Sequence, residues 1–173
     1  MRAKVADKAL TEAAFLRRYG GVYEHSPWIA RAVCSRGGGA ADSWQELDAQ
    51  FRAVIDEAGE PRQLELLNAH PQLACAPAAR EQLTAASKRE QSGAGLDQCS
   101  PAEFEEFQRL NRRYRERFGF PFIMAVAGCE RAAILEALRE RVGRARPEEF
   151  DEALQQVLMI GRLRLREAWH EQR

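Results

Sequence analysis

The chain has 173 residues, a size that fits one domain with a substantial core. Its 26 lysines and arginines balance its 26 aspartates and glutamates, so no net charge favours nucleic acid or an anionic membrane surface. Charged residues also interrupt every apolar run well before the roughly 18 residues that a membrane span needs. We expect no secretory leader, and no CxxC pair occurs among the cysteines, Cys34, Cys75, Cys99 and Cys129. These features predict a single cytoplasmic domain over residues 1–173, with a flexible N-terminus over residues 1–9.

Helical periodicity dominates the first part of the chain. Thr11 is placed to cap a helix over residues 11–19, and Ser26 with Pro27 is placed to begin another over residues 26–34. A glycine loop at 37–39 ends that helix, and further helices are predicted over residues 42–58 and 61–69. The helix over 42–58 carries an apolar stripe at three-and-four spacing that should enter the core: Trp44, Leu47, Phe51, Val54 and Ile55.

The second part of the chain is also helical in pattern. Residues 77–92 are Ala-rich and charged, and the glycines of "SGAGL" then supply a helix stop. The segment 100–119 has the clearest signals, with a Ser100 cap, Glu103 for a capping box and Gly119 past the end. Two helices over 129–143 and 147–169 close the chain, the second with an apolar side formed by Phe150, Leu154, Val157, Leu158, Leu165 and Trp169.

The stretch "FPFIMAVAG" (120–128) is uncharged and apolar and contains a proline. It could be a strand, but the sequence offers no second strand to pair with it, and an unpaired strand would leave backbone groups unsatisfied. We therefore expect a buried extended segment near 120–127 between helices. The predicted fold class is all-α, a compact single-domain multi-helix bundle.

His70 is the histidine with the strongest functional signal. Pro71 disfavours a helical conformation at His70, so the chain should turn there and present the imidazole at a helix end. His25 and His170 fall in a loop and at the terminus without acidic or thiol partners at metal-ligand spacing. We therefore expect those two to be surface residues and expect no metal site.

Three further features could bind a small polar ligand. Ser87, Glu90 and Gln91 share one helical face and offer donors and acceptors suited to a urea-like group, although a solvated polar face is the alternative. The segment near 120–127 has backbone groups that a polar heterocycle could satisfy, with core packing as its alternative. On the last helix, Arg162 and Arg164 flank the apolar side at about 80° each, and periodicity does not choose between them.

Taken together, "NAHPQL", "SKREQSGAGL", "LNRRYRERFGFPFIMAV" and "IGRLRL" resemble the family of 2-oxo-4-hydroxy-4-carboxy-5-ureidoimidazoline (OHCU) decarboxylases of urate degradation. The similarity runs in order from about residue 10 to about residue 168, over nearly the whole chain. One departure is Gln72, where the family usually has Asp; it affects a local cap or hydrogen bond and leaves the histidine in place.

This resemblance implies an all-helical, cofactor-free homodimer that converts OHCU to (S)-allantoin and carbon dioxide. By position, the catalytic histidine matches His70, the catalytic acid matches Glu90, and the arginine near the ligand matches Arg164 through the family's "LRL" element. The substrate-contacting positions match Pro71, Ser87, Gln91, Phe122, Ile123, Met124, Ala125 and Val126. Two alternatives stay open: a decarboxylase of a related ureido or imidazoline acid, and a non-enzymatic helical binding module.

Overall fold

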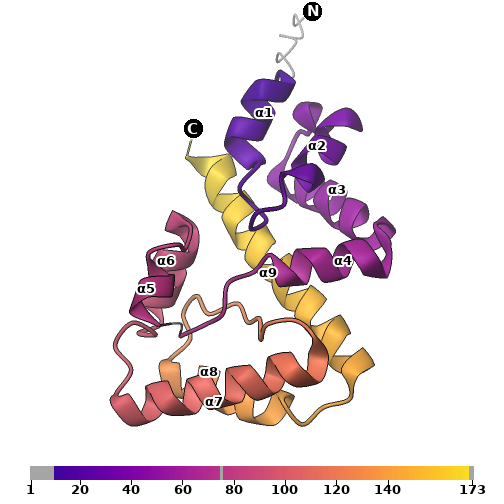
Figure 1. Cartoon of the computed structure of the whole chain (residues 1–173). Coiled ribbons are helices and arrows are strands. Elements are labelled where there is room, and N and C mark those ends of the chain that lie inside the picture. Colours follow the sequence, from indigo (N-terminus) through magenta and orange to yellow (C-terminus); the bar gives the residue numbers. More distant parts are fainter. Residues whose placement is uncertain (1–9, 75, 172–173) are drawn as a thin grey trace, which may run out of the picture. The chain divides into compact units, whose positions relative to one another are not determined.

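The computed structural model describes residues 10–74 and 76–171 (Figure 1). Over these residues the chain is helical and contains no β-strand, so the all-α prediction is confirmed for them. They form two compact units, described separately below: unit 1 comprises residues 10–62 and 161–171, and unit 2 comprises Gln63–Ile160 without residue 75. The expected flexible segment 1–9 and the Cys75 thiol lie outside the described residues. The expectation of a single domain stays a prediction.

Unit 1 contains the N-terminal helices and the end of the last helix. Its elements are α1 (Glu12–Tyr19), α2 (Pro27–Ser35), the 3-10 turn η1 (Gly38–Ala40), α3 (Trp44–Glu57), the start of α4 (Gly59–Asn68) and the final part of α9 (Arg146–His170). Helix α2 packs against α1 and α3 (Figure 1). The four predicted helices of this part of the chain are therefore present, although α4 begins at Gly59 rather than at residue 61.

The helix caps of unit 1 follow the sequence signals except at Ser26. Thr11 caps α1 as predicted, because its Oγ1 accepts the Ala14 N–H at 3.3 Å. The expected side-chain cap at Ser26 is wrong, because the Ser26 hydroxyl makes no hydrogen bond to an N–H of α2. It donates instead to the Glu24 carbonyl oxygen at 2.9 Å. Ser26 follows a turn in which His25 adopts φ +46° and the Ser26 N–H donates to the Tyr23 carbonyl oxygen at 3.2 Å, and its hydroxyl bonds back into this turn.

The predicted apolar stripe of α3 enters the core of unit 1. Four of its five members are buried, namely Leu47, Phe51, Val54 and Ile55. The Phe51 ring lies against the rings of Phe15 and Tyr23, with centroid separations of 6.4 and 5.9 Å. Trp44 is only half-buried, and the guanidinium groups of Arg162 and Arg166 lie over its ring.

Unit 2 holds the remaining helices, which include α5 (Pro77–Arg80), α6 (Ala85–Gly93), α7 (Pro101–Phe118) and α8 (Arg131–Arg141). The capping box of α7 is complete: Ser100 Oγ accepts the Glu103 N–H at 3.2 Å, and Glu103 Oε2 accepts the Ser100 N–H at 2.8 Å. Gly119 ends α7 in the left-handed conformation at φ +82°.

In the part of the chain that the structure describes, no helix combines the length and the hydropathy that crossing a membrane requires.

The apolar stretch after α7 is neither helix nor strand, as predicted, and residues 120–123 and Val126 are buried. Phe120 and Phe122 both lie against the ring of Tyr114, with centroid separations of 6.0 and 5.5 Å. Two residues at i and i+2 that meet the same neighbour are typical of extended backbone. Met124 and Ala125, in the middle of this segment, are only half-buried.

Candidate functional site

His70 lies two residues after the end of α4 and is 6% exposed. Its backbone N–H donates to the Leu67 carbonyl oxygen at 3.2 Å, and its ring Nδ1 lies 3.1 Å from the Leu66 carbonyl oxygen. Because a carbonyl oxygen only accepts, Nδ1 must carry the hydrogen in that bond. In the neutral ring the lone pair is then on Nε2, the atom that can accept a proton.

The segment that follows His70 is tied directly to α6 through Gln91. The side-chain Oε1 of Gln91 accepts the Ala74 N–H at 3.2 Å, and its Nε2 donates to the Gln72 carbonyl oxygen at 3.3 Å. Gln91 is 6% exposed, so these bonds are shielded from water. The structure thus brings residues 72–74, which follow the His70-Pro71 turn, against Gln91 of α6 within unit 2.

Two side-chain amides of α7 hold the same segment from another side. Asn111 Nδ2 donates to the Leu73 carbonyl oxygen at 3.0 Å, and Gln108 Nε2 donates to the Ala74 carbonyl oxygen at 2.7 Å. Ala74 has φ +52°, a left-handed conformation that costs a non-glycine residue about 1–2 kcal/mol. The strained turn persists because both backbone groups of Ala74 are bonded. Sequence reasoning missed Gln108 and Asn111.

Gln72, the departure from the family pattern, also takes part in this arrangement. Its side-chain Nε2 donates to Gln108 Oε1 at 3.3 Å, which leaves Gln108 Nε2 for the Ala74 carbonyl. An aspartate could only accept at this position, whereas the glutamine donates. The hydrogen bond from Gln72 to α7 is therefore one that an aspartate could not donate.

The face of α6 that carries Ser87, Glu90 and Gln91 is partly buried. Ser87 is 2% exposed, while Glu90 is half-buried and lies one residue before the buried Gln91. Thr84 begins the helix, with its Oγ1 accepting the Ser87 N–H at 3.3 Å. The alternative of a fully solvated polar face is wrong for Ser87 and Gln91, which lie in the interior.

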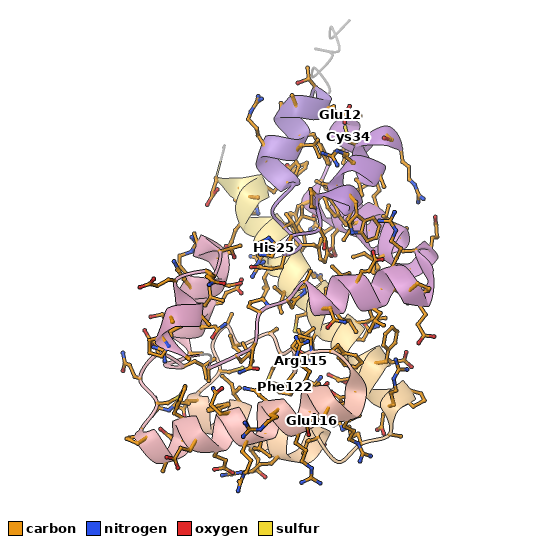
Figure 2. The ribbon with its side chains drawn as sticks, viewed as in Figure 1. Glu12, His25, Cys34, Arg115, Glu116 and Phe122 are labelled. Atoms are coloured by element: carbon orange, nitrogen blue, oxygen red, sulfur yellow. The ribbon has the colours of Figure 1, made fainter. Side chains whose placement is uncertain are left out.

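Two side chains anchor the backbone of the segment 122–126 (Figure 2 labels Phe122). The carbonyl oxygen of Ile123 accepts from Arg141 Nη1 at 2.8 Å, and the N–H of Ala125 donates to Gln156 Oε1 at 2.9 Å. The N–H groups of Met124 and Val126 make no hydrogen bond to any other described residue. Backbone N–H groups that lack a protein acceptor can donate to a polar ligand.

Arg141 belongs to a buried charged cluster beneath this segment. Arg141 Nε donates to Glu149 Oε1 at 2.7 Å, and the Tyr114 hydroxyl donates to the same oxygen. Arg141 is 4% exposed and Glu149 is fully buried. Burial, reinforced by the hydrogen bond to the Glu149 carboxylate, raises the pKa of Tyr114 far above its usual range. The tyrosine hydroxyl therefore stays protonated and remains a donor.

In unit 1 the structure separates the two arginines that the helical wheel left equivalent. Arg164 is buried, and its Nη1 lies 2.8 Å from Glu24 Oε2 and 3.5 Å from the Val22 carbonyl oxygen. Arg162 is exposed and forms a looser pair with Asp48 at 3.8 Å. Glu24 was missed by the sequence reasoning, because no local pattern links it to a residue 140 positions away.

The other two histidines lie on the surface, as predicted. His25 is exposed in the loop between α1 and α2, and His170 is exposed at the end of α9 (Figure 2 labels His25). Within residues 10–74 and 76–171, no three or more His, Cys, Asp or Glu side chains are grouped so that they could hold a metal ion.

Comparison with known proteins gives a consistent picture. The family model described as OHCU decarboxylase matches residues 8–166. A 2-oxo-4-hydroxy-4-carboxy-5-ureidoimidazoline decarboxylase from Haloferax volcanii is 43% identical over 159 residues, which cover 91% of this chain and 90% of the relative.

Two solved structures are also similar. A crystal structure of (S)-allantoin synthase superposes with a TM-score of 0.73 at 32% identity, covering 92% of this chain and 51% of that one. A crystal structure of OHCU decarboxylase in the presence of (S)-allantoin superposes with a TM-score of 0.65 at 25% identity, covering 87% of this chain and 96% of that one.

Proposed function

The chain belongs to the OHCU decarboxylase family, and from that premise we propose that it converts OHCU to (S)-allantoin and carbon dioxide in urate degradation. The observation that carries the proposal is His70, which is buried and oriented through Nδ1 at a turn tied to α6. A buried imidazole held in one tautomer is suited to act as a general acid and base.

The substrate can lose carbon dioxide without help from an electron-accepting cofactor. Its carboxylate sits on a ring carbon that also bears a hydroxyl group and lies next to a ring C=N bond. When the carbon–carboxylate bond breaks, the electron pair moves toward the ring nitrogen, which takes a proton. The resulting enol becomes the ring carbonyl when its hydroxyl proton leaves and another proton reaches the carbon that bears the ureido group.

In this proposal His70 controls those proton movements. Nε2 can take the hydroxyl proton and deliver a proton to one face of the ring carbon that bears the ureido group, which sets the configuration of allantoin. The bond from Nδ1 to the Leu66 carbonyl keeps the ring from rotating and stabilises the imidazolium when it forms. Pro71, the next residue in the chain, is proposed as a substrate contact beside His70.

The other candidates bind and orient the substrate. Ser87 and Gln91 offer a hydroxyl and an amide to the ureido group, and Glu90 either accepts its N–H groups or orients His70. In the segment 122–126, with residues Phe122, Ile123, Met124, Ala125 and Val126, the free backbone N–H groups donate to ring oxygens.

Arg164 is proposed to hold a substrate oxygen. A guanidinium that gripped the departing carboxylate strongly would stabilise the ground state and slow the reaction. Glu24 shares the charge of Arg164 and so weakens such a grip. We therefore assign Arg164 to an oxygen whose negative charge grows as carbon dioxide leaves.

His70→Asn tests the proposal against the rival reading of a binding module. The amide keeps a donor near Leu66 but cannot exchange a proton, so the decay of freshly generated OHCU should fall to the spontaneous rate, and allantoin should form without its circular dichroism signal. His25→Asn is the matched control, because His25 is exposed, and it should behave as wild type. Wild-type turnover in His70→Asn would contradict the assignment, and a wild-type protein with no effect on OHCU would contradict the function.

Two further properties of the protein, its oligomeric state and its location, are proposed with this function. We infer a homodimer, as the family resemblance implies, and each unit exposes one large apolar side chain of α9, Leu163 at 39% in unit 1 and Met159 at 51% in unit 2. Sedimentation velocity should give twice the chain mass of 19.6 kDa. We also infer a cytoplasmic location, since Cys34, Cys99 and Cys129 are free thiols and a reducing compartment keeps thiols in this form.

A further inference from the structure

The backbone of the segment 122–126 is anchored on one edge only. In extended chain the polar groups of residues i and i+2 face the same edge, and those of the residue between them face the other. The carbonyl of Ile123 and the N–H of Ala125 thus share an edge, which Arg141 and Gln156 bind at 2.8 and 2.9 Å.

The opposite edge carries the N–H groups of Met124 and Val126. Neither group bonds to another residue in the described part of the chain, although Val126 is 4% exposed. Buried N–H groups are nearly always paired in folded proteins. An edge with two such donors about 6–7 Å apart along extended chain is suited to the oxygens of a small ligand.

The anchors are themselves held in place. Gln156 Nε2 donates to Glu152 Oε1 at 2.8 Å, which fixes the orientation of the amide so that Oε1 faces Ala125. Arg141 is fixed by Glu149, and its guanidinium lies 4.6 Å from the centre of the Phe122 ring. A buried ion pair gives little stability over apolar packing. Here the pair with Glu149 fixes the direction in which Arg141 Nη1 meets the Ile123 carbonyl oxygen.

We propose that Gln156 and Arg141 are positioning residues for catalysis: they lock the edge of residues 123 and 125 so that the Met124 and Val126 N–H groups face the substrate at a fixed spacing. This inference rests on the proposed function, which takes 122–126 as substrate-contacting. Neither side chain needs to touch the substrate. Their effect on the reaction comes from placing donors to within a fraction of an ångström, a precision on which rate depends steeply.

Gln156→Leu removes the acceptor for the Ala125 N–H while keeping the size of the side chain. We expect kcat/KM for OHCU to fall about 10-fold with a helical circular dichroism spectrum like that of wild type. Hydrogen exchange of the Ala125 amide should accelerate, whereas exchange within α7 should not change. The exposed Gln98→Leu is the control and should leave kinetics and exchange as in wild type.

A rescue variant separates positioning from a general loss of packing. In Glu152→Gln combined with Gln156→Glu, the carboxylate at position 156 can still accept the Ala125 N–H, and the amide at position 152 can donate to it. This double variant should recover kcat/KM to within about 2-fold of wild type. Wild-type kinetics in Gln156→Leu, or a double variant as impaired as Gln156→Leu, would overturn the proposal.

Arg141→Lys tests the second anchor with its charge retained. A lysine can satisfy Glu149 or the Ile123 carbonyl but not with the same forked geometry, so kcat/KM should fall several-fold. Arg139→Lys, on the exposed side of the same helix, should not change it. If wild type fails to accelerate OHCU decay, the proposed function fails and the catalytic role with it, while Ala125 exchange still reports whether Gln156 anchors the segment.

Discussion

Arg164 and Glu24 form an ion pair in the interior of unit 1, with 2.8 Å between Nη1 and Oε2 and side chains that are 8% and 2% exposed. Arg162, on the same helix as Arg164, forms a second ion pair with Asp48. This pair is longer, with 3.8 Å between Nε and Oδ2, and is partly exposed. The two pairs allow a direct comparison of a buried and a surface charge in one protein.

Glu24→Ala should destabilise the chain far more than Asp48→Ala. Removing one partner of a buried pair leaves an uncompensated charge and typically costs about 3–5 kcal/mol, whereas an exposed pair contributes about 0–1 kcal/mol. Urea denaturation of the two variants measures the difference. Equal losses of unfolding free energy would show that the Glu24 carboxylate contributes no more than a surface charge.

Gly161 permits a close approach between α9 and Tyr23. A Cβ at position 161 would lie 2.3 Å from Tyr23 Cζ and 2.5 Å from its hydroxyl oxygen, and the ring is buried on all sides. Gly161→Ala should therefore reduce the unfolding free energy by about 1–3 kcal/mol, the usual cost of overpacking a core. Thermal or urea unfolding of wild type and variant measures this loss of unfolding free energy.

Gly93→Ala supplies the matched control with the opposite sign. Gly93 is the last residue of α6, and a Cβ there would meet nothing within 4 Å. Alanine should gain up to about 1 kcal/mol at such a site, because glycine is the poorer helix former and loses more backbone entropy on folding. If both variants lose stability equally, the contact with Tyr23 is not the cause.

The local parts of this fold are readable from sequence. The capping box of α7 needs only Ser100, Glu103 and the spacing between them, and the helix begins where that pattern places it. The segment after α7 was likewise predicted as buried and extended, because an apolar run with no pairing strand has few other solutions. Both arguments depend on residues that are near neighbours in the chain.

The tertiary parts of the candidate site are not readable in the same way. Gln108 and Asn111 lie on α7 and bond to backbone more than 30 residues earlier, and nothing local distinguishes them from surface amides. The choice between Arg162 and Arg164 was equally open on a helical wheel and was made only by the family resemblance. In the structure Arg164 is the buried one, because Glu24 gives its charge a partner.

Glu103 should make stability depend on pH in a defined direction. The hydrogen bond from the Ser100 N–H, followed by that from Arg131, lowers the pKa of the Glu103 carboxyl below its ordinary value. Because the folded state binds this proton more weakly than the unfolded state, the contribution is fully present above the unfolded pKa of about 4.3 and is lost as pH falls through the lower folded value.

Glu103→Gln isolates this contribution. Urea midpoints of wild type and variant should differ at pH 7, with wild type the more stable, and the gap should narrow as pH falls below about 4. Glu105→Gln, on the same turn but exposed, is the control and should show no such convergence. A gap for Glu103→Gln that stays constant down to the lowest pH at which the chain folds would mean that the uncharged part of the cap, and not the carboxylate, supplies the stability.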